Sequence, residues 1–435
     1  MSGVDPTLFL NGNHSALSPI YSSEMSIWEN KGFDATQIFA VNLQNKQFPI
    51  GNQANFGGTD RFKLMKQGGR VWNGHLEVDI SAGVVNVLNE GAYVNDLGNN
   101  LIESIRVDYA SKTIHEYSGE ELKFYQSLMY HPITRENNFA LTLGGLPPGG
   151  AGFEAQRQAN IALAIKLLIP LDWLWFTRSE DYAATPEALS AELDIIVKYR
   201  PLNQLVYGRV ILGGATVNPF TTEPAITRCQ LCTQIVHPPK AEKAKHLATF
   251  ESRQGQIYKI LDWERQPRNV INAAAGQYPI KLDNLRGDCK FLMFVIRDIG
   301  IETAFERDRT ESDSTATILS GGGSVASLLP FTSFNLRSNN SLIVDETTEL
   351  EARVLWRKLY LPGASRNDLV YFIPLSSMMM REHKNVVGFQ NLSNLGNLVL
   401  NLTMPVHGVQ RLVDIWACVH NVVQQKKGDI TKVNR

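Results

Sequence analysis

The sequence predicts an all-β protein in which two similar β-sandwiches follow one another along the chain. Apolar and polar residues alternate in most segments that show any periodicity, helical signals are few and short, and one tripeptide recurs about half a chain apart. At 435 residues the chain has room for two all-β domains, which commonly reach about 200–250 residues each.

Alternation with a period of two residues is found, in chain order, at residues 75–80, 105–109, 193–199, 350–357 and 398–404. We expect each of these to be a strand with one face in the core and the other toward solvent. Residues 291–296 are continuously apolar, which suits a strand that is buried on both faces. Residues 226–236 also have the character of a strand.

Helical signals occur at two places. Ser118 and Glu121 have the spacing of a capping box, and Leu122, Tyr125 and Met129 follow at helical intervals. Residues 240–247 (KAEKAKHL) follow two prolines, which favour the first turn of a helix, and we expect a short connecting helix there. The glycine-rich segments 144–152 and 321–324 are expected to be surface loops.

An internal echo supports two equivalent halves. Ile-Pro-Leu occurs at 169–171 and again at 373–375, each time after an apolar run and about 25 residues before an alternating strand. Together with the central helix, this predicts a lead-in arm at 1–50, a first domain at 51–237, a linker with a short helix at 238–248, and a second domain at 249–435.

Composition excludes several classes of protein. The chain has 42 Lys and Arg residues against 43 Asp and Glu residues, which gives a net charge of −1. Without an excess of positive charge, we do not expect the chain as a whole to bind nucleic acid electrostatically. The most apolar stretch, 161–176, is interrupted by Lys166, Pro170 and Asp172, which predicts no membrane-spanning helix. The N-terminus shows no secretory signal, so we expect cytosolic synthesis and unmodified sequons at Asn13, Asn339, Asn391 and Asn401.

The four cysteines are too sparse for a disulfide scaffold. Cys229 and Cys232 form a CxxC pair with His237 nearby, but no second pair exists to complete a zinc site. Residues three apart on a strand also point to opposite faces, so the pair would not converge on one ion. We predict buried thiols and no metal site.

No catalytic constellation is apparent. His115-Glu116 lacks the second histidine of a metalloprotease helix, residues 322–326 fail the nucleophile-elbow pattern, and no phosphate-binding glycine motif opens a helix. The aromatic segment 173–176 would suit stacking on bases or sugars, but its continuity with the preceding apolar run favours core packing. We therefore predict no enzymatic activity, no cofactor and no catalytic residues.

Five segments carry a family resemblance when they are taken in order. They are residues 95–105 (NDLGNNLIESI), 168–176 (LIPLDWLWF), 199–202 (YRPL), 371–375 (YFIPL) and 391–395 (NLSNL). In order and spacing they resemble the double-jelly-roll major capsid proteins of the nucleocytoplasmic large DNA viruses. Asp172 replaces a proline that the family usually has, and residues 381–384 (REHK) replace its Glu-His-Gln run, which indicates a divergent member.

The resemblance implies a fold of two tandem eight-stranded antiparallel jelly rolls with short helices in the loops. It implies a homotrimer that forms a pseudo-hexameric capsomer, one of many that tile an icosahedral shell. Expected partners are further copies, minor capsid or penton proteins and an inner membrane beneath the shell, reached by the arm, with no sequence-specific contact to nucleic acid. The protein would be made in the host cytoplasm and reside in the virion. A minor capsid paralogue and a carbohydrate- or receptor-binding β-sandwich protein are the alternatives.

Overall fold

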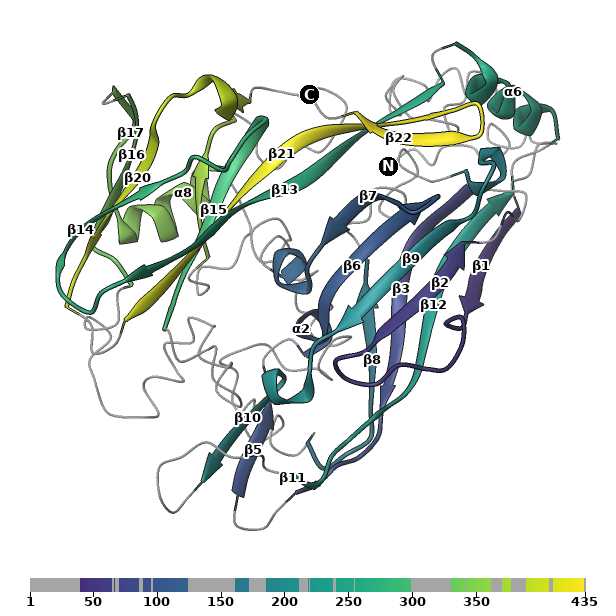
Figure 1. Ribbon diagram of the computed structural model, residues 1–435, viewed down its shortest axis with the longest axis horizontal. Helices are drawn as coiled ribbons and strands as arrows, with labels where there is room; N and C mark the ends of the chain where they lie inside the picture. The colour runs from purple at the N-terminus through teal and green to yellow at the C-terminus, as the bar shows by residue number, and fades with distance from the viewer. Residues whose placement is uncertain are drawn as a thin grey trace, which may run out of the picture.

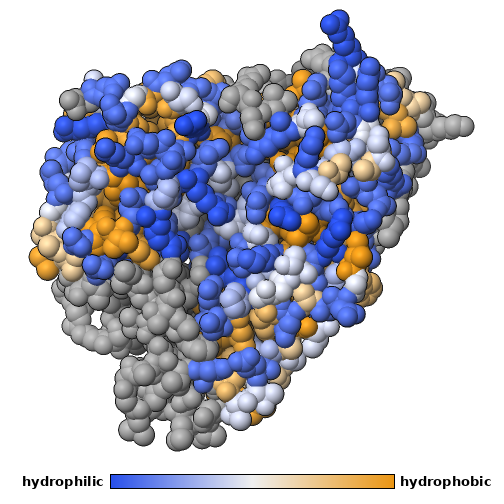
Figure 2. Space-filling view, in the orientation of Figure 1, coloured by the Kyte–Doolittle hydropathy of each residue, from blue (hydrophilic) through white to orange (hydrophobic). Residues whose placement is uncertain are grey.

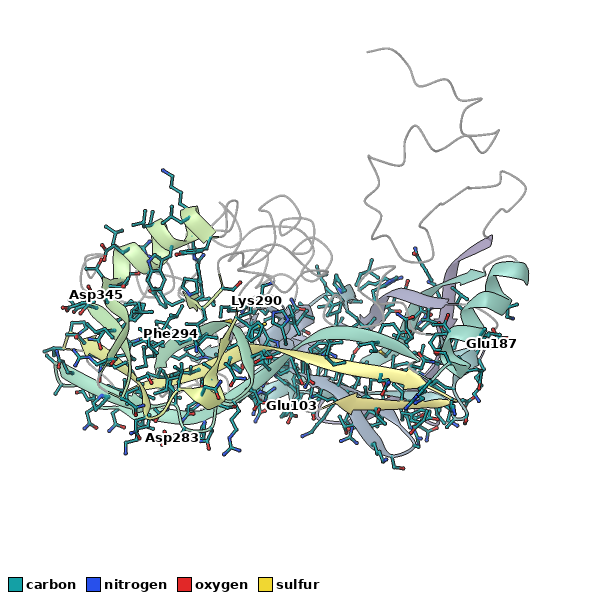
Figure 3. All side chains as sticks on the ribbon, turned by 90° about the horizontal axis from the view of Figure 1, so that it is seen from above. Glu103, Glu187, Asp283, Lys290, Phe294 and Asp345 are labelled. Atoms are coloured by element: carbon teal, nitrogen blue, oxygen red, sulfur yellow. The ribbon has the colours of Figure 1, made fainter. Side chains whose placement is uncertain are left out.

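The computed structural model describes residues 40–64, 66, 70–85, 89–94, 97–123, 161–171, 185–210, 218, 220–237, 240–253, 255–298, 330–339, 341–360, 370–376, 389–406 and 410–433. Both glycine-rich segments, the aromatic segment 173–176, Tyr125 and Met129 lie outside these residues. The described chain forms two β-sandwiches that lie side by side (Figures 1 and 3).

The first sandwich consists of two four-stranded antiparallel sheets. One sheet has the order β1 (Ala40–Gln47), β12 (Ile226–His237), β3 (Arg70–Ile80) and β8 (Ile165–Pro170). The other has the order β2 (Thr59–Leu64), β9 (Leu193–Tyr199), β6 (Ile102–Tyr109) and β7 (Lys112–Tyr117). If these eight strands are numbered along the chain, the sheets read 1-8-3-6 and 2-7-4-5, which is the strand order of a jelly roll.

The second sandwich repeats this arrangement. Its first sheet has the order β13 (Gln256–Ile271), β21 (Arg411–Lys426), β15 (Asp288–Asp298) and β18 (Val370–Pro374). Its second sheet has the order β14 (Gly276–Lys281), β20 (Leu398–Met404), β16 (Ser333–Ser338) and β17 (Ser341–Thr348). The strand orders are again 1-8-3-6 and 2-7-4-5, so the expectation of two tandem eight-stranded jelly rolls is confirmed.

Shorter strands and helices lie outside the sixteen strands of the two sandwiches. Small strand pairs join β4 (Val84–Val85) to β11 (Phe220–Thr222) and β5 (Asn89–Tyr93) to β10 (Val206–Val210), while β19 (Gln390–Asn391) and β22 (Asp429–Val433) extend the second sandwich. The helices are α2 (Leu97–Leu101), α6 (Lys240–Glu251), η8 (Glu351–Leu355), α8 (Trp356–Tyr360) and single turns at Pro186–Ala188, Leu202–Gln204 and Leu392–Asn394. Among the described helices, none has the length and apolar character to cross a bilayer.

The two halves share a hydrophobic core, which explains the continuous apolar run in β15. Leu292 and Phe294 point into the core of the second jelly roll, where Phe294 stacks on Tyr371 with ring centroids 5.3 Å apart. Phe291 and Met293, on the other face of the strand, belong to the same buried cluster as the interior of the first jelly roll. The strand is therefore buried on both faces, as predicted, because it lies between two cores. Figure 3 shows Phe294 within the second sandwich.

The Ile-Pro-Leu echo marks equivalent positions. The Ile-Pro pair ends β8 at Pro170 and β18 at Pro374, the sixth strand of each roll, and the leucine is the first residue after the strand. The amide of Leu171 donates to the carbonyl oxygen of Gly74 at 2.9 Å, and that of Leu375 donates to Lys290 at 3.1 Å, each on the third strand of its roll. The alternating strands that follow, β9 and β20, are the seventh strands of the two rolls.

One predicted strand is wrong. Residues 350–357 form helix η8, a π-helical segment, and the start of α8. The cause is local: the amide of Thr348 donates to a carboxylate oxygen of Glu351 at 2.8 Å, and the amide of Glu351 donates to the Thr348 hydroxyl at 3.3 Å. This capping box, with an ion pair between Glu349 and Arg353 one turn apart, outweighs the alternation of apolar residues.

The halves interlock beyond the predicted boundaries. Strand β1 falls within the predicted arm, yet it pairs with β12 along the first sheet. Helix α6 forms where the connecting helix was expected, and it ends at Glu251, four residues beyond the predicted end. The hairpin of β21 and β22 reaches back to the first roll (Figure 1), where the Ser190 amide and the Tyr109 hydroxyl both donate to the carbonyl oxygen of Gly428. The exact domain division stays a prediction.

Candidate functional site at the junction of the two jelly rolls

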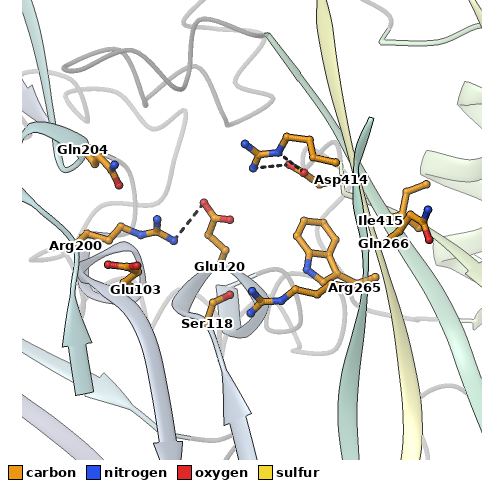
Figure 4. A pocket seen from close by; sticks show the side chains of 11 residues that line it. Glu103, Ser118, Glu120, Arg200, Gln204, Arg265, Gln266, Asp414 and Ile415 are labelled. Atoms are coloured by element: carbon orange, nitrogen blue, oxygen red, sulfur yellow. Dashed lines mark hydrogen bonds and ion pairs between the residues drawn. The ribbon is translucent and has the colours of Figure 1, made fainter. Parts of the chain in front are cut away.

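A polar cavity of about 420 Å³ lies between the two jelly rolls (Figure 4). The first roll contributes Glu103, Ser118, Glu120, Arg200 and Gln204 to its walls, and the second contributes Arg265, Gln266, Arg268, Asp414, Ile415 and Trp416. Five of the six charged groups come from strand β13, strand β21 or the segments that follow β7 and β9, and Glu103 comes from β6. The cavity is therefore formed only when both rolls are in place.

The capping box predicted at Ser118 places two carboxylates at this junction. The Ser118 amide donates to Glu121 Oε2 at 2.7 Å and the Glu121 amide donates to Ser118 Oγ at 3.2 Å, which confirms the reciprocal cap. Gly119 is required between them, because a Cβ there would lie 1.8 Å from the carbonyl oxygen of Asn99. The cap therefore packs directly on helix α2, and Glu120 and Glu121 project toward the second roll.

Arginines of the second roll bind these carboxylates. Arg265 Nε donates to Glu121 Oε1 at 2.5 Å, so Glu121 both caps its helix and joins the two rolls. Arg297, whose side chain is fully buried, lies 3.4 Å from both carboxylate oxygens of Glu120. Arg200 of the first roll approaches the same carboxylate at 3.4 Å.

Asp414 completes the network on the side of the second roll. Arg268 forms a bidentate pair with it, at 2.6 Å and 3.2 Å, and Arg297 Nε lies 3.3 Å from its second oxygen. Burial lowers the pKa of Arg200 to about 10, with neighbouring guanidinium groups, chiefly that of Arg297, acting in the same direction. Burial also lowers the pKa of Arg297. Burial opposes the charged form of Arg265 too, but the hydrogen bond and the charge of Glu121 outweigh it and raise the pKa of Arg265 above its usual value.

This arrangement favours a mechanical role over a catalytic one. Glu120, Glu121 and Asp414 each bind at least one guanidinium group, so none of the three is poised as a base or nucleophile. Buried, well-bonded ion pairs fix geometry, because removal of either partner leaves an uncompensated charge. The network can therefore hold the two jelly rolls at one relative angle.

A second polar contact joins the rolls at His115. This histidine is 1% exposed on β7, and its Nε2 lies 3.9 Å from Asp262 Oδ1 on β13. Lys432 of β22 pairs with the same aspartate. Burial lowers the pKa of His115, and the nearby lysine acts in the same direction, while Asp262 opposes them.

The structure separates the CxxC cysteines as the strand geometry predicts. Cys229 lies in the core of the first roll, while Cys232 lies on the other face of β12. All four cysteines are free and buried. Burial raises the pKa of Cys229 to about 12 and that of Cys232 to about 11, which keeps both thiols protonated at neutral pH.

Sequence reasoning predicted no site residues and missed the junction. Its charged groups lie on five separate segments of the chain, and none of them belongs to a recognisable motif apart from the capping box at Ser118. That box is the one signal in the sequence, and by itself it predicts only the start of a helix.

No family model matches the sequence, and no curated protein matches it either. The solved structures do match. The quasi-atomic model of the PBCV-1 virus capsid superposes with a TM-score of 0.67 at 13% identity, covering 94% of this chain and 100% of that one. The Faustovirus major capsid protein gives 0.66 at 9% identity, covering 97% and 98% of the two chains. The mavirus major capsid protein gives 0.52 at 10% identity, covering 95% and 93%. The chain therefore has the double-jelly-roll fold of these viral capsid proteins, at a sequence identity that marks it as divergent.

Proposed function

We propose that the chain is a structural capsid subunit, three copies of which form a pseudo-hexameric capsomer of an icosahedral virus shell. The observation that carries this is the repetition of one strand order in both halves, locked together by a shared core and a buried charge network. Three such subunits around a threefold axis present six similar sandwiches, so a trimer fills a nearly hexagonal tile. Closed cyclic symmetry of this kind is common among homo-oligomers.

In this role the chain has no enzymatic activity. Its partners are further copies, neighbouring capsomers, minor capsid or penton proteins and an inner membrane beneath the shell, without sequence-specific binding to nucleic acid. Synthesis in the host cytoplasm and final location in the virion belong to the same proposal. Figure 2 supports a protein with defined contact areas, since the face it shows is mainly hydrophilic with separate apolar patches.

The test is the oligomeric state of the purified chain. Light scattering coupled to size exclusion is expected to give the mass of a trimer, and negative-stain images are expected to show pseudo-hexagonal outlines. A monomer that binds defined glycans on an array would contradict the proposal and favour the carbohydrate-binding alternative. A trimer present in only a few copies per virion would identify the minor capsid paralogue.

An apolar stripe on helices η8 and α8 is the contact surface between copies in this proposal. Leu350, Leu355 and Leu359 are 61%, 45% and 63% exposed. The spacing of five residues along the π-helical segment and then four along the α-helix places them on one side. We assign these exposed leucines, which share one side of the helical segment, to a contact between copies.

Replacing Leu355 and Leu359 together by aspartate is therefore expected to yield folded monomers, because two charges would be buried in the trimer contact. The readout is the mass in solution, with circular dichroism to verify the fold. Lys358→Ala, an exposed change on the same helix, serves as the matched control and leaves the trimer intact. Trimers that persist in the double aspartate variant would remove this stripe from the interface.

The arm is proposed to connect capsomers to neighbouring capsomers, minor proteins or the membrane. Its test is deletion of residues 1–39, since a longer cut would remove part of β1 from the first sheet. Trimers are expected to form normally while their assembly into shells is weakened, as measured by particle yield. Loss of trimers would show that the arm acts within the capsomer.

A further inference from the structure

Three metal-ligating side chains converge on the outer face of the sheet formed by β1, β12, β3 and β8. His75 and Glu77 lie two residues apart on β3, so both point away from the core, which holds Leu76 and Val78 of the same strand. Cys232 on β12 is the direct cross-strand partner of His75. The ligand atoms of the three side chains all lie within 4.8 Å of one another.

This geometry suits one small cation. Zinc binds sulfur, nitrogen and oxygen ligands at about 2.0–2.3 Å, so two ligand atoms on one tetrahedral ion are about 3.5 Å apart. Small rotations of the three side chains would bring their atoms from the observed separations to that distance. The i, i+2 pair with a directly opposed partner places all three within reach, because opposed Cβ atoms are about 4.5–5.5 Å apart.

The surroundings distinguish this cluster from a chance surface group. Glu77 and Cys232 are 7% and 1% exposed although they are on the outer face of the sheet. Glu77 is held by Lys46, whose Nζ lies 2.8 and 3.0 Å from its two oxygens, and by Lys166 at 3.4 Å. Both lysines are partly exposed, so their ammonium groups can move into solvent on their long stems. The two ammonium groups therefore lie where a bound metal ion would lie beside the Glu77 carboxylate.

We propose that His75, Glu77 and Cys232 bind one divalent cation of the zinc class, with solvent as the fourth ligand. The mixed nitrogen, oxygen and sulfur set selects a borderline-soft metal, whereas calcium and magnesium prefer sites made of oxygen alone. Binding displaces the proton of the Cys232 thiol into solvent, and the resulting thiolate and the Glu77 carboxylate together balance the two positive charges of the ion, which replaces Lys46 as the partner of Glu77. The bound ion clips β3 to β12, the two central strands of this sheet, and stabilises the first jelly roll by mass action.

The experiment is a cobalt(II) titration of the purified full-length chain under reducing conditions. One equivalent is expected to produce the near-ultraviolet charge-transfer absorption of a cobalt–thiolate bond, and zinc is expected to abolish it by displacement. Cys232→Ala is expected to eliminate the absorption. Cys229→Ala, three residues away on the core face of the same strand, is the matched control and is expected to retain it.

Two further variants make the outcome specific. His75→Gln, at a half-buried position, is expected to weaken binding by more than the about 10–100-fold typical for loss of an outer-shell partner. Lys46→Met is expected to strengthen binding by about tenfold, because it removes the cation that competes for Glu77. The proposal is overturned if no charge-transfer absorption appears at one equivalent, if the absorption survives Cys232→Ala, or if Lys46→Met weakens binding. The readout uses the folded chain in solution, so its result is independent of the capsid proposal.

Discussion

Replacing Arg297 by methionine is expected to lower the free energy of unfolding by about 3–5 kcal/mol, the usual cost of breaking a buried ion pair by removing one partner. The Arg297 side chain is fully buried between the rolls, where it contacts Glu120 of the first and Asp414 of the second. Its guanidinium also lies 6.0 Å from the ring centroid of Trp416. Methionine would fill much of the volume but leave both carboxylates with fewer cationic partners.

Urea denaturation of the wild type and the variant measures this difference. Arg61→Met is the matched control, because Arg61 also pairs with an aspartate, Asp194, but is 53% exposed in its side chain. Exposed pairs contribute about 0–1 kcal/mol, so the control is expected to change stability by no more than that. Equal effects of the two substitutions would mean that the junction network does not hold the rolls together.

Stability is expected to fall as the pH drops below about 6.5, the ordinary pKa of histidine. The pKa of buried His115 is lowered in the folded protein, so the unfolded chain binds a proton at a higher pH than the folded chain does. Acidification therefore favours unfolding, by up to about 1.4 kcal/mol per pH unit, between the unfolded and the folded pKa of this group. The groups that face it are Asp262, Lys432 and the Tyr117 ring, whose centroid is 6.0 Å away.

Denaturation curves between pH 7.5 and 5 test this expectation, with His115→Gln as the comparison. The variant is expected to have a shallower pH dependence, because its side chain has no proton to gain. Some dependence remains, since burial also lowers the pKa of His75. If the pH dependence of stability were unchanged in His115→Gln but reduced in His75→Gln, the acid-sensitive group would be His75, in the sheet of β1, β12, β3 and β8, and not His115 at the junction.

Much of the fold could be predicted because local chemistry and burial agree along most strands. In β9 and β20 every second residue is buried, so the sequence pattern and the tertiary environment carry the same information. The capping box at Ser118 and the proline-led helix α6 are local as well, and both formed where they were expected. The strand predicted at residues 350–357 is wrong because two local signals compete there, and the capping box of Thr348 and Glu351 outweighs the alternation of apolar residues.

The candidate sites could not be predicted, because their members are far apart in the chain. Glu120 and Arg297 lie 177 residues apart and meet only when the two rolls dock. The sequence places Cys232 close to Cys229, whereas the register of β12 against β3 pairs it with His75.

By itself, the sequence determined that the chain is all-β, that it is built from two equivalent halves, and that β15 is buried on both faces. Each of these properties follows from the order of polar and apolar residues along a segment, which is a local quantity. The tertiary structure alone decided which charges meet at the junction and which thiol faces a histidine. Those contacts depend on strand register and on the docking of the two sandwiches, and neither is encoded in the spacing of residues along the chain.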